Sequence, residues 1–151
     1  MSKTVIPIQI RALIPTSAGC AVFLGNEEKV FVIYIDQSVG LAIGKFLSGE
    51  SKERPMTHDL MGHILAALGA KVERAVINDV KSGVYFGRLI LTAENELHQR
   101  KIVELDARPS DCMAMASQQG APLFVSQVVW DEVEDSTELL KTLKQSESQS
   151  E

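Results

Sequence analysis

Two apolar-rich runs of nine residues, 72–80 and 84–92, are separated only by Lys81, Ser82 and Gly83. A connection this short, with glycine in it, predicts a β-hairpin, because parallel strands need a much longer crossover. The chain must therefore fold around an antiparallel pair of strands, and every other element has to pack against that pair.

Shorter strand-like segments lie on both sides of the hairpin. Residues 30–35 are apolar throughout, which predicts a central strand covered on both faces. A last strand at 123–126 is expected to continue through 128–133. The other predicted strands are residues 6–12, 20–24 and 100–106.

Three segments have the apolar spacing and the end signals of helices: 36–49, 57–68 and 109–119. Thr57 is the predicted N-cap of the second helix, and Pro109 suits the first turn of the third. The apolar stripe of the second helix consists of Leu60, Met61, Ile64, Leu65 and Leu68.

The order of these elements indicates an α+β protein, because strands and helices do not alternate strictly. We predict a mixed, largely antiparallel sheet with about three helices packed on it, in a single compact domain. A length of 151 residues with 45% hydrophobic and 23% charged residues is typical of one soluble globular domain.

The negative charge is concentrated near the C-terminus. Residues 131–151 hold seven acidic and two basic residues, so residues 1–130 are formally neutral. We predict a domain at 1–133 and an acidic polar tail at 134–151, partly disordered, with a short helix no further than residue 143. A neutral body lacks the basic footprint of a tight, sequence-independent nucleic-acid binder but leaves room for a small local site.

The two cysteines, Cys20 and Cys112, lie far apart without metal-binding spacing, so neither a disulfide scaffold nor a structural zinc site is expected. The first eleven residues alternate like a strand rather than forming the apolar core of a signal peptide. No apolar run approaches the length of a membrane span. We therefore expect a cytoplasmic protein with no membrane partner.

Carboxylates gather at the end of the 100–106 strand and the start of the third helix. Glu104 and Asp106 share a strand face, and Asp111 lies in the first helical turn. Asp106 and Asp111 are candidate ligands for Mg²⁺ or Mn²⁺, and Arg108 is a candidate phosphate clamp. In the structural alternative, Asp111 satisfies helix N–H groups and Arg108 pairs with Asp106.

A second candidate site lies at the start of the second helix. Asp59 and His63 share one helix face, and a carboxylate beside an imidazole could act in acid–base catalysis. The alternative is a capped helix start with an exposed histidine. Cys112 is expected to be a buried packing residue.

Five segments occur in order: Pro-Met-Thr-His-Asp-Leu (55–60), Leu-Gly-Ala-Lys-Val-Glu (68–73), Tyr-Phe-Gly-Arg-Leu (85–89), Asp-Ala-Arg-Pro-Ser-Asp (106–111) and Gly-Ala-Pro-Leu-Phe-Val (120–125). Over residues 5–130 the chain resembles the bifunctional nuclease domain family, a widespread bacterial and plant group. The resemblance implies an α+β domain, activity on DNA and RNA, and a homo-oligomer (a dimer or larger). The positions carried over by motif are His58, Asp59, Asp106, Arg108, Ser110 and Asp111.

One position departs from the family's pattern. Val39 occupies the place where many members have glutamate, which puts activity in question if that glutamate is catalytic or binds a metal. Asp36, the predicted N-cap of the first helix, is a possible replacement for the charge.

Two hypotheses of different class follow. The first is a metal-assisted nuclease of low sequence specificity, with Mg²⁺ or Mn²⁺ at Asp106 and Asp111, Arg108 and Ser110 binding substrate, and His58 or Asp59 moving protons. The second is a non-catalytic regulatory or interaction module that keeps the fold without the activity. A weaker third is a small-molecule or nucleotide site at the start of the third helix.

Overall fold

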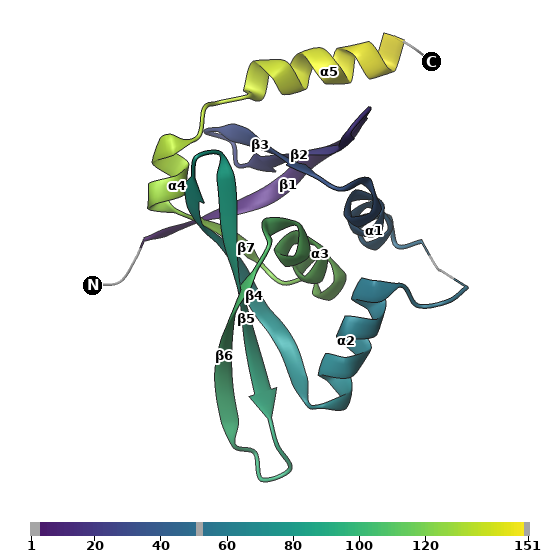
Figure 1. Cartoon of the computed structure of the whole chain (residues 1–151), viewed down its shortest axis with the longest axis vertical. Helices are drawn as coiled ribbons and strands as arrows, with labels where there is room; N and C mark the ends of the chain where they lie inside the picture. Colours follow the sequence, from purple (N-terminus) through teal and green to yellow (C-terminus); the bar gives the residue numbers. More distant parts are fainter. Residues whose placement is uncertain (1–3, 51–52, 150–151) are drawn as a thin grey trace.

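A computed structural model describes residues 4–50 and 53–149 of the chain. The predicted hairpin is present as β4 (Ala70–Lys81) and β5 (Val84–Glu94) (Figure 1). Ser82 and Gly83 in its turn have positive φ angles of 51° and 78°, as the tight turns that match the twist of paired strands require.

The hairpin belongs to a seven-stranded sheet with the order β3-β2-β1-β7-β4-β5-β6. Its other strands are β1 (Val5–Thr16), β2 (Gly19–Gly25), β3 (Val30–Ile35), β6 (Arg100–Ala107) and β7 (Leu123–Ser126). Only β4 and β7 are parallel neighbours, so the predicted mixed, largely antiparallel sheet in one compact α+β domain is confirmed.

The helices number five in the described residues, where about three were predicted. They are α1 (Gln37–Ser48), α2 (Thr57–Ala67), α3 (Pro109–Gln119), α4 (Gln127–Glu132) and α5 (Thr137–Gln149). The strand expected at 128–133 was wrong: the Ser126 hydroxyl accepts the Val129 N–H (3.3 Å) and starts α4 instead. Over the described ranges, no helix combines the length and the apolar character needed to cross a bilayer.

The C-terminal segment is more ordered than expected. Helix α5 continues to Gln149, whereas regular structure was not expected beyond residue 143. Leu140 is buried and Leu143 is half-buried against the strands that precede them, which anchors the helix. Residues 150–151 of the predicted tail lie outside the described residues, and the division at residues 133 and 134 stays a prediction.

Strand β2 is buried along its whole length, whereas β3, which was predicted to be central, is an edge strand. The predicted cover on both faces holds for residues 30–33 of β3, which pack in the same two clusters as β2. Val22 and Leu24 of β2 pack in the main core, while Ala21 and Phe23 pack in a second cluster with Leu140 of α5. Figure 1 shows β1, β2 and β3 lying between α5 and α1. The apolar run at 30–35 forms an edge strand, and its Tyr34 is 68% exposed.

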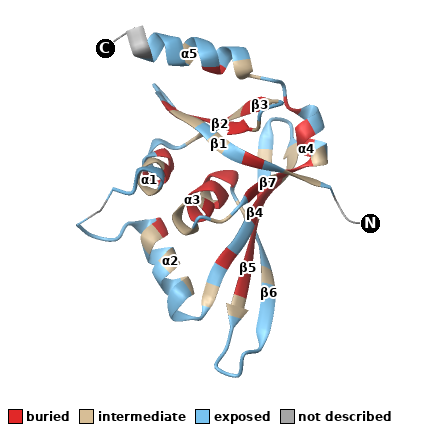
Figure 2. Ribbon diagram, turned by 180° about the vertical axis from the view of Figure 1, so that it is seen from behind, coloured by how far each residue is buried: buried red, intermediate tan, exposed pale blue. Residues whose placement is uncertain are grey.

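Helix α3 lies at the centre of the fold, between α1 and α2 and against the sheet (Figure 1), and most of it is buried (Figure 2). Helix α2 is different, because most of its apolar stripe faces outward in Figure 2. Leu65 is half-buried, but Leu60, Met61, Ile64 and Leu68 are 37–72% exposed. The amphipathic pattern identified the stripe correctly, yet no element of the described chain covers it.

Candidate functional site

The site is built on the turn between β6 and α3. Arg108 has extended backbone at the N-cap, Pro109 begins the helix as predicted, and Asp111 lies in its first turn. Gly87 of β5 lets this turn approach the sheet, because an added Cβ would lie 2.7 Å from Cys112 Sγ and 2.9 Å from the Ala107 carbonyl oxygen. Close packing therefore fixes where the first turn of α3 presents its side chains.

Asp111 contacts two of the other predicted site residues, His58 and Arg108. Its Oδ1 lies 2.9 Å from His58 Nε2, and its Oδ2 accepts a hydrogen bond from Arg108 Nε at 2.9 Å. The His58 side chain is 10% exposed and that of Arg108 is 64% exposed. The carboxylate thus orients a nearly buried imidazole on one side and an accessible guanidinium on the other.

The charges in this cluster stabilise one another. Burial raises the pKa of Asp111, but the hydrogen bonds from Arg108 and His58 together lower it below its ordinary value. The hydrogen bond to Asp111 raises the pKa of Arg108 above its ordinary value. The arrangement therefore holds an ionised carboxylate beside a permanent cation near neutral pH.

Close packing of α2 on α3 brings His58 to Asp111. A Cβ on Gly62 would lie 2.3 Å from Gln118 Oε1, and Gln118 Nε2 donates to the His58 carbonyl oxygen at 2.6 Å. Neither Gly62 nor Gln118 was predicted from the sequence as part of the site. A glycine inside an amphipathic helix signals such an approach, since it is otherwise unfavourable there.

Asp36 also reaches the cluster. Its side chain makes no capping hydrogen bond on α1, and its Oδ2 lies 3.8 Å from Arg108 Nη1. Val39, three residues later, is buried in the main core at 7% exposure. Val39, at the position of the family's glutamate, is therefore a packing residue in this chain. The acidic side chain that reaches Arg108 from this segment is Asp36.

The remaining predicted site residues lie apart from this cluster or have structural partners. Asp59 Oδ2 accepts the Met56 N–H at 2.8 Å, so Met56, not Thr57, is the N-cap of α2. Ser110 is buried at 8% exposure.

Asp106 is opposite Arg88 in the β6–β5 register, while the adjacent Ala107–Gly87 pair faces α3. Asp106 therefore points to the other face of the sheet.

These donors do not fit a metal ion shared by Asp106 and Asp111. The Asp106 side chain lies on the face of the sheet opposite α3, whereas Asp111 is on α3 itself. Both Asp111 oxygens already have cationic or N–H partners. Within residues 4–50 and 53–149, no three His, Cys, Asp or Glu side chains are grouped as metal ligands. Any metal at the cluster would have to be held largely by substrate oxygens and water.

Cys112 follows Asp111 but faces the core, with no exposed surface. Burial raises the pKa of its thiol to about 12, with smaller contributions from Asp111 and Asp106. A thiol that stays protonated and inaccessible is a packing group, as expected from the sequence.

The lowered pKa of Asp111 predicts a pH-dependent stability. Asp111 contributes stability above about pH 4, near the unfolded-state pKa of an aspartate, and that contribution is lost as pH falls through the lower folded-state value. The gap in unfolding free energy between wild type and Asp111→Asn should therefore narrow from pH 7 to about pH 3. Urea titrations measure it, with the exposed Asp131→Asn as control, and a pH-independent gap would contradict the assigned ion pairs.

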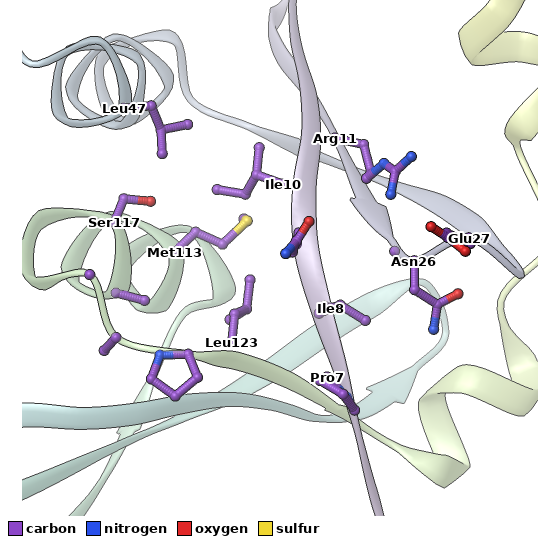
Figure 3. A pocket seen from close by; sticks show the side chains of 16 residues that line it. Pro7, Ile8, Ile10, Arg11, Asn26, Glu27, Leu47, Met113, Ser117 and Leu123 are labelled. Carbon is purple, nitrogen blue, oxygen red and sulfur yellow. The ribbon is translucent and has the colours of Figure 1, made fainter.

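A hollow of about 800 Å³ lies on the side of α3 that faces away from Asp111. Figure 3 shows Ile10, Leu47, Met113 and Leu123 around it, with Asn26 and Glu27 across β1. Its inner walls are mainly aliphatic and hold no acid–base pair. The cluster at Asp111, rather than this hollow, holds the side chains that can transfer protons or bind an anion.

A mixed sheet whose central helix gathers histidine, aspartate and arginine at its first turn defines a small α+β protein with a polar surface site. The chain belongs to the bifunctional nuclease domain family, whose model matches residues 22–138. It is also 33% identical over 104 residues to the uncharacterized protein Rv1829 and to its counterpart MT1877, from two strains of Mycobacterium tuberculosis. Each match covers 69% of this chain and 58% of the relative's length.

Proposed function

We propose that the chain is a nuclease of low sequence specificity that hydrolyses phosphodiester bonds in DNA and RNA. Membership of the bifunctional nuclease domain family supports the reaction class. The observation that carries the site is the contact of Asp111 with both His58 and Arg108, at 2.9 Å each. Residues 53 positions apart are held where they can act on one substrate group.

In this proposal Arg108 binds the scissile phosphate. Its Nε is engaged by Asp111, which leaves N–H groups of its exposed guanidinium to contact phosphate oxygens. Asp111 orients the imidazole by accepting from its Nε2, and His58 Nδ1 takes a proton from the attacking water. The water oxygen forms a bond to phosphorus, the ester P–O bond breaks, and the leaving oxygen is protonated by solvent.

The proposal assigns no step to a metal ion and no substrate contact to Ser110. Asp59 is likewise left out, because its carboxylate accepts the Met56 N–H. The homo-oligomer implied by the resemblance stays a prediction. So do the use of Mg²⁺ or Mn²⁺ and the cytoplasmic location, which were predicted from the residues themselves. Nucleic acid is the proposed substrate.

A non-catalytic regulatory or interaction module is the second candidate. Two carboxylates, those of Asp36 and Asp111, flank the guanidinium of Arg108, and this negative charge opposes phosphate binding. Against the module, Arg108 is 64% exposed and contacts Asp36 and Asp111 rather than being buried against Asp106.

Purified protein incubated with single-stranded RNA and DNA, with Mg²⁺, Mn²⁺ or EDTA, tests the proposal. We expect cleavage of both substrates by wild type. Arg108→Lys should raise KM at least about tenfold, because an ammonium cannot replace the fork geometry of the guanidinium. Cleavage that EDTA abolishes would support the metal-assisted nuclease hypothesis instead. No cleavage under any condition would favour the non-catalytic module.

A further inference from the structure

A second hollow, of about 530 Å³, lies on the face of the sheet opposite α3 and is called here the sheet-face hollow. Ile90 and Thr92 of β5 line it; they alternate with the core residues Leu89 and Leu91 and therefore point away from α3. Its other described lining residues also belong to strands, apart from Pro122 just before β7. Helices α1, α2 and α3 lie together on the other face (Figure 1), so none of them covers this hollow.

The sheet-face hollow offers apolar surface to a flat group. Ile102 of β6 is 74% exposed, and Phe124 of β7 is half-buried. No stacking or cation–π contact between described residues engages the Phe124 ring. Domains that bind single-stranded nucleic acids stack unpaired bases on aromatic side chains of an open sheet in this way.

Two arginines border the same hollow. Arg74 of β4 and Arg100 of β6 come from the strands on either side of β5, and both are exposed. No ion pair between residues of the described ranges engages either guanidinium. An unengaged guanidinium presents a fork of N–H donors that fits the oxygens of a phosphate.

The acidic groups on this face leave the positive charge local. Glu73 is the acid that lines the hollow, and its Oε2 accepts from the Thr92 hydroxyl at 3.5 Å. Glu94, Glu104 and Asp106 share the face but do not line the hollow. Two arginines against one glutamate leave the hollow with a formal charge of +1. A small anion site of this kind is compatible with a chain whose residues 1–130 are formally neutral.

We propose that the sheet-face hollow binds one nucleotide unit of single-stranded RNA or DNA. The base lies against Phe124 and Ile102, and a phosphate lies between Arg74 and Arg100. A volume of about 530 Å³ is within the range of roughly 300–1,000 Å³ that is typical of small-ligand sites. The inference rests on the proposed function for the identity of the ligand, and it adds a second point of attachment to Arg108.

Strand β6 connects the sheet-face hollow to the cluster at Asp111. It runs from Arg100 to Ala107, and Arg108 follows directly. Seven steps of about 3.3 Å put roughly 23 Å between the two ends of the strand. Within the described residues β6 pairs only with β5, so a bound nucleic-acid strand can cross its outer edge to the face that carries Arg108.

Binding without cleavage tests this site. The probe is a labelled single-stranded DNA of about 12 nucleotides with phosphorothioate linkages, which resist hydrolysis, and fluorescence anisotropy measures Kd. Wild type should bind with a Kd of about 1–100 μM. Arg74→Gln and Arg100→Gln should each raise Kd about fivefold or more, and each should lower the slope of log Kd against log salt by about 0.7. Phe124→Leu should raise Kd at least about fivefold, because the aromatic face for stacking is lost.

Lys144→Gln is the matched control, because it removes one positive charge from α5, outside the sheet-face hollow, and should leave Kd unchanged. The exposed arginine variants should fold as wild type does, and thermal unfolding checks Phe124→Leu. A duplex of the same sequence should bind at least about fivefold more weakly, since its bases are already paired and stacked. AMP carries the same base–sugar–phosphate unit without reach to Arg108, so it should displace the strand only at concentrations more than about tenfold higher than the oligonucleotide needs.

A wild type that does not bind the single strand at about 100 μM would overturn the inference. So would a Kd that stays unchanged in all three hollow variants, or a duplex that binds as tightly as the single strand. Displacement by AMP at the concentration of the oligonucleotide would assign the hollow to free nucleotides instead of a strand. The nuclease proposal fails separately, because a chain that binds through the hollow but cleaves nothing keeps this site and loses only the activity.

Discussion

Asp111→Asn is expected to cleave single-stranded RNA and DNA at least about a hundredfold more slowly than wild type, the range for losing a positioned acid–base group. An amide no longer accepts from both partners as a charged carboxylate does, so His58 loses its orienting contact and Arg108 its ion pair. The effect should fall mainly on kcat, because the guanidinium remains available to phosphate.

The matched control is Asp131→Asn, which removes an exposed carboxylate of α4 whose contact is to Gln127. It should cleave at the wild-type rate. Asp106→Asn separates the two forms of the nuclease hypothesis: a loss as large as that of Asp111→Asn would indicate the shared metal site. Equal cleavage by wild type and Asp111→Asn would place the activity outside this cluster or in a contaminant.

Phe31→Ala is expected to lower the free energy of unfolding by about 3–5 kcal/mol. Phe31 is 1% exposed, and its ring lies 6.3 Å from those of Tyr85 on β5 and Trp130 on α4. It therefore ties the edge strand β3 to the tip of the hairpin and to the segment after β7, and its removal leaves a cavity where these elements meet.

Urea unfolding followed by fluorescence of the single tryptophan, Trp130, measures this change. In a chain of this size each kcal/mol lowers Tm by about 2–4 °C, so a drop of roughly 6–20 °C is expected. Phe31→Leu retains most of the volume and should cost less than about 1.5 kcal/mol. A small effect for Phe31→Ala would mean that the hairpin tip does not depend on β3.

The sequence predicted the elements with local signals and failed where long-range contacts decide. Pro109 and Gly120 set the ends of α3, and the Ser82–Gly83 turn set the hairpin, because proline and glycine restrict or permit particular backbone angles locally. The runs at 30–35 and along α2 showed that an apolar face exists. They could not show what covers it, since that depends on segments distant in sequence.

In the candidate site, too, local features were predicted from the sequence and long-range contacts were not. The position of Asp111 in a first helical turn followed from spacing, but its contact with His58 depends on how α2 packs on α3, where Gln118 donates to the His58 carbonyl oxygen. Asp106 was grouped with Asp111 because the two are near in sequence. Strand alternation sends its side chain to the other face, and the β5–β6 register is needed to see this.

Helix α5 lies almost wholly beyond the 22–138 span that matches the family model, yet its Leu140 shares a cluster with Phe23 of β2. The span that matches the family model therefore ends before Leu140, which completes the buried cluster around Phe23. A chain shortened at residue 138 would present the Phe23 face of its sheet to solvent. Nuclease activity should accordingly be compared with that of relatives on a chain that keeps residues 139–149. A chain without them would differ in solubility for reasons unrelated to the site.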